Sequence, residues 1–197
     1  HCYQLHDMEM MIRLSHEFGF QITSFHHSLE AYQLRGSSSY LASCICLCIS
    51  DSVLAGSRYK MVPTLLREGI IVATWPDNWV GKAEGYDTYF HAPAWLVAGG
   101  VPLVLKSDHP VTDARELMYS AARAHHYGLS MRDALAALTI NPARTLGLDA
   151  RIGSLEVGKD ADIVLYDGDP LDPRTRVMRV WIEGELQYDR EETRAFF

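Results

Sequence analysis

The sequence predicts an α/β fold, in which helices cover a parallel sheet, followed by a small β element. Short apolar runs of strand length alternate with amphipathic helical segments over residues 1–150, a pattern typical of parallel sheets buried on both faces. After residue 150 the pattern changes to turn-rich sequence and short strands without helices between them. Residues 1–150 and 151–197 are therefore expected to be two distinct parts of the 197-residue chain.

The helices of the first part are predicted from apolar residues at helical spacing and from residues that favour helix ends. The first helix opens with Asp7, a good N-cap, and closes with Gly19, a good C-cap. Ser130 resembles the start of a capping box, with Asp133 three positions later, and Asn141 before a proline is predicted to cap a short helix. The predicted helices are 7–19, 29–34, 59–68, 91–98, 113–127, 130–138 and 141–147.

The strands of the first part are short apolar runs, each followed by polar residues, and they are predicted at 20–25, 70–74 and 101–105. In parallel α/β folds the loops at the carboxyl ends of the strands form the active site, so polar residues there are catalytic candidates. His1 would join them if a strand preceded it. The candidates that follow the three strands are His26 and His27, then Asp77 and Asn78, then Asp108 and His109.

Two further regions complete the chain. Strands are predicted at 163–166, 177–182 and 185–188, with a hairpin turn at Glu183 and Gly184. Residues 36–57 are rich in Ser and Cys and fit no element, so they are interpreted as an insertion or a surface loop. This segment is too short and too polar at its ends for a membrane span.

The composition favours a small-molecule ligand over a macromolecular one. The net charge is -7 and no basic face stands out, which argues against nucleic acid or an anionic membrane as a partner. The four cysteines do not resemble a disulfide framework, because three of them lie in one short run. A reducing compartment is favoured and no signal peptide is visible, so a cytoplasmic location is expected.

Imidazoles and a carboxylate at strand ends are the ingredients of a hydrolytic divalent-metal site. Each residue also has a purely structural explanation. Asp108 has the sequence context of a turn cap, and one of His26 and His27 should point away from the site because strand side chains alternate. His1 has the alternative of an unordered terminus.

The run Cys44-x-Cys46-x-Cys48 would place three thiols on one face of a strand, where they could bind a soft metal. Zinc sites favour two or more residues between cysteines, and no histidine-rich segment flanks the run. We therefore interpret the run as small hydrophobic residues, and a thiol metal or redox protein is the least favoured function.

One long stretch resembles a known family. Residues 137–171 read ALTINPARTLGLDARIGSLEVGKDADIVLYDGDPL, which is similar to the C-terminal signature of the amidohydrolase superfamily, the metal-dependent hydrolases related to imidazolonepropionase. The match is specific: Thr-x-Asn-Pro-Ala, then Leu-Gly, then Gly-Ser-Leu-Glu-x-Gly-Lys-x-Ala-Asp, then a strand. The resemblance extends over nearly the whole chain except residues 36–57.

The resemblance implies roles for individual residues. His27 in FHHSLEAY, Asp108 in KSDHP and His1 in HCY resemble metal ligands of the family, and Asp108 also resembles the family's proton acceptor. His109 is expected to orient Asp108 or to line the substrate pocket. The loop DNWVGKAEGYD resembles one that lines this pocket and contains Trp79, Lys82, Glu84 and Tyr86.

The resemblance also implies the architecture. Residues 1–150 resemble strands five to eight of a TIM-like (β/α)8 barrel of a metal-dependent hydrolase, and residues 151–197 resemble its returning β element. The family's His-x-His motif on strand one and its carboxylated lysine on strand four have no counterpart here. Half a barrel would leave sheet edges open, so homo-oligomerisation or pairing with an N-terminal half is expected.

The implied activity is metal-assisted hydrolysis of a non-peptide, often cyclic, C–N bond in a small amide. Zinc is the expected cofactor, as one or two ions, although other divalent metals suit the same ligands. This chain alone is expected to be inactive, because it holds only part of the ligand set. The alternative is a non-catalytic fragment or interaction module that keeps only the fold of the family.

Overall fold

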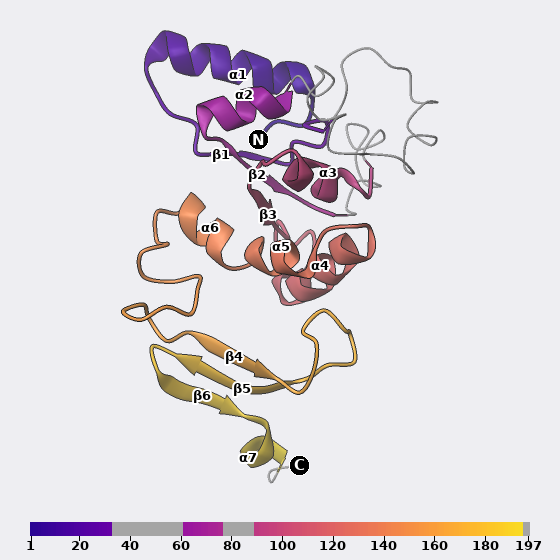
Figure 1. The fold of residues 1–197 in the computed structure, drawn as a ribbon, viewed down its shortest axis with the longest axis vertical. Coiled ribbons are helices and arrows are strands. Elements are labelled where there is room, and N and C mark those ends of the chain that lie inside the picture. The colour runs from indigo at the N-terminus through magenta and orange to yellow at the C-terminus, as the bar shows by residue number, and fades with distance from the viewer. Residues whose placement is uncertain (33–60, 77–88, 195–197) are drawn as a thin grey trace.

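The computed structural model describes residues 1–32, 61–76 and 89–194, with side chains described up to residue 192 (Figure 1). Several predicted features therefore lie outside the described residues. They are the insertion at 36–57 with its three cysteines, the first two residues of the helix at 59–68, residues 33–34, Asp77 and Asn78, and the loop with Trp79, Lys82, Glu84 and Tyr86.

A parallel three-stranded sheet forms the centre of the first part, as predicted. It consists of β1 (Ser24–His26), β2 (Ile71–Thr74) and β3 (Leu103–Leu105) in the order β1-β2-β3. Phe25 lies opposite Val72, and Val72 lies opposite Leu103. Beyond β1, Cys2 forms a parallel bridge with His27, so the segment that begins at His1 runs alongside the sheet in the same direction.

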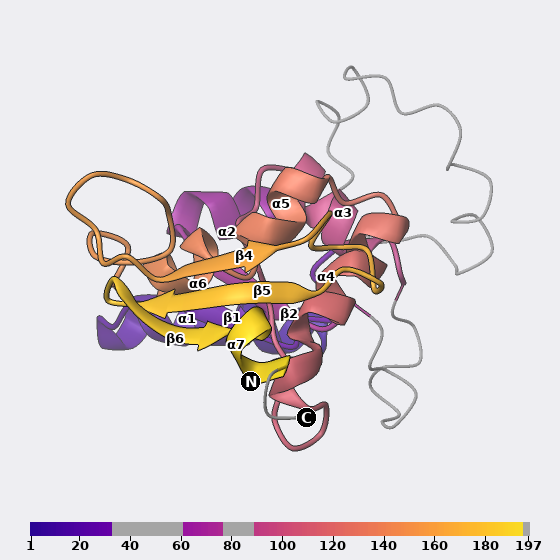
Figure 2. The same cartoon turned by 90° about the horizontal axis from the view of Figure 1, so that it is seen from below.

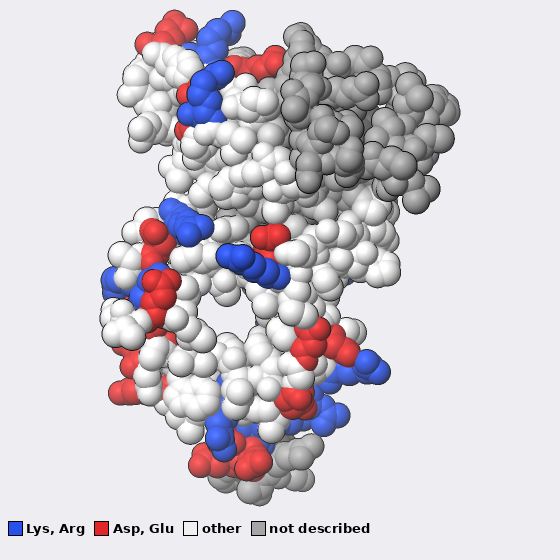
Figure 3. Space-filling view, viewed as in Figure 1, with Lys and Arg blue, Asp and Glu red and all other residues white. Residues whose placement is uncertain are grey.

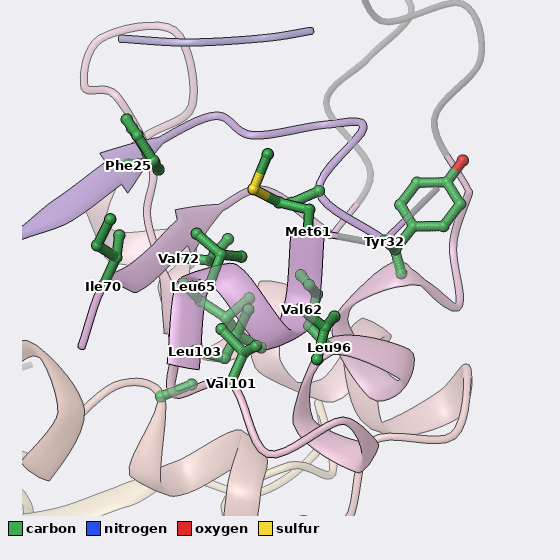
Figure 4. Close-up of a cluster of buried hydrophobic side chains, with 14 of the residues drawn as sticks. Phe25, Tyr32, Met61, Val62, Leu65, Ile70, Val72, Leu96, Val101 and Leu103 are labelled. Carbon is green, nitrogen blue, oxygen red and sulfur yellow. The ribbon is translucent and has the colours of Figure 1, made fainter. Parts of the chain in front are cut away.

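Helices pack on this sheet and enclose a hydrophobic core (Figure 1). Leu65, Val72 and Leu103 are almost fully buried and lie close together in Figure 4, so a helix and two strands meet there. Burial of these side chains is the main stabilising contribution to this part. The helices are α1 (Leu5–Phe18), α2 (Met61–Glu68), α3 (Ala92–Ala98), the short 3-10 helix η4 (Ala114–Glu116), α4 (Leu117–His126), α5 (Met131–Ala136) and α6 (Ile140–Thr145).

Two predicted helix ends are confirmed and three predictions about helices are wrong, the third of which concerns Asn141. Gly19 ends α1 with φ 70°, and the Ser130 side chain accepts a hydrogen bond from the backbone N–H of Asp133. Asp7 is not the N-cap, because α1 already begins at Leu5 after Gln4. Residues 29–32 form turns rather than a helix, and the N–H of Glu30 donates to the carbonyl oxygen of Tyr3, outside this segment.

Asn141 has a different role from the predicted cap. Helix α6 begins before it, at Ile140, and its amide Nδ2 donates a hydrogen bond to the carbonyl oxygen of Leu103 at 2.8 Å. The N–H of Leu105 donates to the carbonyl oxygen of Ala137 at 3.1 Å. The carbonyl of Leu103 and the N–H of Leu105 point away from β2, toward the outer edge of β3. We expected this edge to be open, and in the structure it is partly occupied by these two hydrogen bonds.

The second part is an antiparallel sheet that contains β4 (Ile163–Tyr166), β5 (Val177–Ile182) and β6 (Glu185–Asp189) in that order, followed by α7 (Arg190–Arg194). Glu183 and Gly184 have φ 52° and 83°, which confirms the predicted hairpin turn. The three strands lie side by side in Figure 2, and Figure 3 shows the surface hollowed between this sheet and the helices. None of the side chains in these strands is buried.

Candidate metal centre

Five side chains gather where the parallel strands end. His27 follows β1, Trp75 follows β2, and Lys106 and Asp108 follow β3. His1 is brought beside His27 by the bridge between Cys2 and His27. Because all strands run in one direction, their carboxyl ends meet at one edge of the sheet, and this edge is where the sequence predicts the site.

His27 is the centre of the group. Its side chain is only 3% exposed, and its Nε2 lies 2.7 Å from Nδ1 of His1 and 3.8 Å from Oδ2 of Asp108. Its other ring nitrogen, Nδ1, lies 3.2 Å from Nζ of Lys106. The structure thus brings together the three residues that the sequence predicts as ligands.

The backbone that presents these side chains adopts the left-handed region at His27, Ser28 and Asp108, with φ of 73°, 47° and 54°. This conformation costs a non-glycine residue on the order of 1 kcal/mol or more. Hydrogen bonds hold it in place at β1, where the N–H of His27 donates to Ala73 at 2.8 Å and that of Ser28 donates to Cys2 at 2.7 Å. The chain therefore turns sharply at two strand ends, which directs His27 and Asp108 toward each other.

The same turn affects how the His26–His27 pair lies relative to His1. Strand alternation predicts that one imidazole points away from the site. In the structure the ring of His26 lies 5.3 Å from that of His1, and the ring of His27 lies 4.9 Å from it. Both rings can approach His1 because the positive φ of His27 interrupts the alternation of β1.

Lys106 dominates the electrostatics of the site. Its Nζ lies 2.9 Å from Oδ1 of Asp108 and 3.9 Å from the ring centre of Trp75, and its side chain is 10% exposed. Burial acts to raise the pKa of Asp108, but the hydrogen bond and charge of Lys106, together with the charges of His27 and His26, outweigh it and hold that pKa below its usual value. Asp108 is therefore an ionised carboxylate at neutral pH, able to accept a proton. Burial, followed by the charge of Lys106, lowers the pKa of His26.

Two aromatic rings flank His27. The ring of Tyr3 stacks on it with centroids 4.3 Å apart, and the ring of Trp75 lies at 4.6 Å in a tilted arrangement. Neither of these residues nor Lys106 was among the predicted site residues. The sequence could have indicated Lys106, because it lies two residues before Asp108 and side chains at this spacing lie on the same side of an extended chain.

The donors suit a divalent ion by type, since imidazole nitrogen and carboxylate oxygen are the usual non-thiol ligands of zinc. Two ligands of one tetrahedral zinc ion lie roughly 3.3 Å apart. His1 and His27 are closer, at the hydrogen-bond distance of 2.7 Å, and His27 and Asp108 are farther apart, at 3.8 Å. Within the described part of the chain, no group of three or more His, Cys, Asp or Glu has the geometry of a metal site. His1, His27 and Asp108 therefore match an ion by the type of their donors and not by their spacing in this structure.

His109 is exposed beside this group, and its predicted role in orienting Asp108 or binding substrate stays a prediction. Among the described residues, the buried hydroxyl of Ser28 has no hydrogen-bond partner. No helix in the described ranges is long and apolar enough to cross a membrane.

Imidazoles and a carboxylate at the carboxyl ends of parallel strands are typical of metal-dependent hydrolases built on α/β barrels, and the arrangement here resembles the sites of that class. A sequence profile of the amidohydrolase family matches residues 22–188. The chain belongs to the amidohydrolase family.

Individual relatives agree with this assignment. The amidohydrolase tasK of Hapsidospora irregularis is 35% identical over 189 residues, which are 96% of this chain and 17% of that protein. An imidazolonepropionase of Syntrophobacter fumaroxidans is 42% identical over 83 residues, 40% of this chain and 19% of that protein. The chain is thus imidazolonepropionase-like and spans less than a fifth of either relative.

Solved structures share the fold. An amidohydrolase from Thermotoga maritima superposes with a TM-score of 0.78 at 34% identity, covering 96% of this chain and 43% of that one. An adenosine deaminase from Xanthomonas campestris with bound zinc has a TM-score of 0.56 at 16% identity, covering 93% of this chain and 49% of that one. At that identity the second likeness concerns the fold alone.

Proposed function

We propose that this chain contributes the second half of a TIM-like (β/α)8 barrel to an enzyme that hydrolyses a non-peptide C–N bond in a small amide. The observation that carries the proposal is the convergence of His1, His27 and Asp108 at the carboxyl ends of parallel strands. Membership of the amidohydrolase family supports the reaction class. The imidazole and carboxylate donors of these residues support a divalent ion as cofactor.

His1, His27 and Asp108 would hold the ion. The chemistry supplied by a bound divalent ion is Lewis acidity, which makes a water molecule more acidic and the scissile carbonyl more electrophilic. The remaining ligands would come from the other half of the barrel. One ion or two, and zinc or another divalent metal, are compatible with these donors.

Asp108 performs the proton transfers. Its carboxylate accepts a proton from the attacking water while the water oxygen bonds to the carbonyl carbon, and it then donates that proton to the departing nitrogen as the C–N bond breaks. The products are a carboxylic acid and an amine. Lys106 keeps Asp108 ionised before the reaction, because its ammonium lies 2.9 Å from the carboxylate.

His27 is held in place for this chemistry by its surroundings. Tyr3 stacks on one face of its ring and Trp75 lies beside it, so few rotamers of His27 are accessible. Burial of His27 also excludes water from the imidazole, which strengthens its electrostatic interactions. Both effects suit a residue that holds an ion in one position.

A chimera tests the proposal. The chain covers 43% of the Thermotoga maritima amidohydrolase, so the preceding part of that enzyme can be fused to residues 1–197. With added zinc, we expect the chimera to hydrolyse cyclic amides and the isolated chain to show no turnover, because two imidazoles and one carboxylate form an incomplete ligand set.

Asp108→Asn in the chimera is the matched control, since it keeps the shape of the side chain but cannot accept the proton. It should lower kcat by about a hundredfold or more. A folded, zinc-loaded chimera without turnover would favour the non-catalytic interaction module, and robust turnover by the isolated chain would contradict its predicted inactivity.

A further inference from the structure

The ammonium group of Lys106 lies beside two residues of the proposed site. It lies 2.9 Å from Oδ1 of Asp108 and 3.2 Å from Nδ1 of His27, and the Trp75 ring centre is 3.9 Å away. A cation thus already contacts two of the three side chains that would hold a metal ion. It belongs to the chain itself and cannot diffuse away.

The contact with His27 determines the positions of the ring protons. An ammonium group has donors only, so Nδ1 of His27 must be the unprotonated acceptor. In the neutral ring the proton then sits on Nε2, which lies 2.7 Å from Nδ1 of His1 and donates to it. The result is a directed chain of two hydrogen bonds from Lys106 through His27 to His1.

This chain of hydrogen bonds opposes metal binding. An ion held at Nε2 of His27 needs the lone pair of that nitrogen, so the neutral ring would carry its proton on Nδ1. An N–H group at Nδ1 would face the ammonium of Lys106, and two donors cannot form a hydrogen bond with each other. The Lys106 contact and an ion at Nε2 therefore exclude each other.

We propose that Lys106 sets the affinity of this site for a divalent ion by competing with the ion for His27 and Asp108. The inference rests on the proposed function, in which both residues are ligands. Lys106 then has two opposite effects: it holds Asp108 ready as a carboxylate, and it must release Nδ1 of His27 before an ion can bind.

The first test needs no metal. Nitrogen-15 NMR of the imidazoles in the metal-free chain, at mildly alkaline pH and assigned with His27→Gln, reports which ring nitrogen carries the proton. We expect the proton of His27 on Nε2 in the wild type, and a shift toward Nδ1 in Lys106→Met. A wild-type His27 protonated on Nδ1 would overturn the inference.

The second test is calorimetric titration of the same chain with zinc. Lys106→Met should bind zinc at least roughly tenfold more tightly than the wild type. The reason is that the ion no longer has to displace the hydrogen bonds of the ammonium with His27 and Asp108. Lys106→Arg keeps a donor-only cation and should bind as weakly as the wild type. Lys159→Met is the matched control, because Lys159 is equally buried but bonds Ser154, away from the site.

His27→Ala separates this inference from the proposed function, with circular dichroism to verify that each variant is folded. If His27→Ala abolishes zinc binding while Lys106→Met and the wild type bind equally, the competition is refuted and the ligand assignment stands. If His27→Ala in the Lys106→Met background leaves zinc binding unchanged, the ligand assignment itself is refuted, and the competition with it.

Discussion

The two sheets of this protein are stabilised in different ways. In the parallel sheet the apolar strands lie under helices, and Val72 is fully buried. In the antiparallel sheet Val164 and Leu165 of β4 are adjacent, point to opposite faces, and are 44% and 45% exposed. The first sheet is thus held by its core, and the second by cross-strand hydrogen bonds and its turn. The parallel sheet also positions the side chains of the candidate site, and such a role requires a sheet held by a buried core.

The largest expected effect comes from the core under the parallel sheet. Leu65→Ala removes a fully buried side chain and should lower the free energy of unfolding by about 3 kcal/mol. Leu165→Ala in β4 is the matched control and should cost less than about 1 kcal/mol, because its side chain is half exposed already. Urea unfolding of both variants measures the difference, and equal losses would contradict the contrast between the sheets.

The next largest effect concerns the edge of the parallel sheet. Asn141→Ala removes the hydrogen bond to the carbonyl of Leu103 and should cost about 1–2 kcal/mol, since a partly buried acceptor loses its donor. Thr139→Ala, at an exposed side chain whose hydroxyl donates to the nearby carbonyl oxygen of Leu135, should cost less than about 0.5 kcal/mol. Thermal unfolding of the two variants would show no difference if the Asn141 contact were unimportant.

A smaller and local effect is expected in the antiparallel sheet. Gly184 has φ 83°, so Gly184→Ala should destabilise the hairpin by about 1 kcal/mol. Hydrogen exchange should become faster for the amides of β5 and β6 and stay unchanged in β1, β2 and β3. Glu183→Gly is the control, because it removes rather than adds a side chain at positive φ, and faster exchange in that variant would argue against backbone strain as the cause.

The smallest effect is a pH dependence located at the parallel sheet. Since the pKa of Asp108 is lowered in the folded state, its ionisation contributes stability above the usual carboxyl pKa, and this is lost as pH falls through the lowered value. Asp108→Asn should remove less than about 1 kcal/mol of acid-dependent stability. Lys106→Met should flatten the same profile of unfolding free energy against pH, and profiles unchanged in both variants would refute the pairing.

Much of the fold could be predicted from the sequence because its signals are local. Apolar runs predicted β2 and β3 to within two residues, and Gly19 and Ser130 marked helix ends correctly. The strand predicted at 20–25 is shorter in the structure, since only residues 24–26 pair with a neighbour. The role of Asn141 could not be predicted, because its partner Leu103 lies 38 positions away.

The site was predictable in part for the same reason. His27 and Asp108 follow strands directly, so their location at the sheet edge follows from topology. The contact of Lys106 with both of them depends on the direction of a long, flexible side chain, which only the tertiary structure determines. The roles of Trp79, Lys82, Tyr86 and His109 in substrate binding stay predictions.

The contacts of Asn141 and Ala137 with β3 bear on how a barrel could close. A strand that adds to the outer edge of β3 needs the carbonyl of Leu103 and the N–H of Leu105, and both are already engaged by the segment 137–141, which leads from the end of α5 into α6. Addition of a further strand at this edge would therefore be an exchange reaction, in which the incoming strand displaces the side chain of Asn141 from Leu103 and the carbonyl of Ala137 from Leu105. Its rate would be governed by how often that segment lifts away, and it would saturate as the partner's concentration rises.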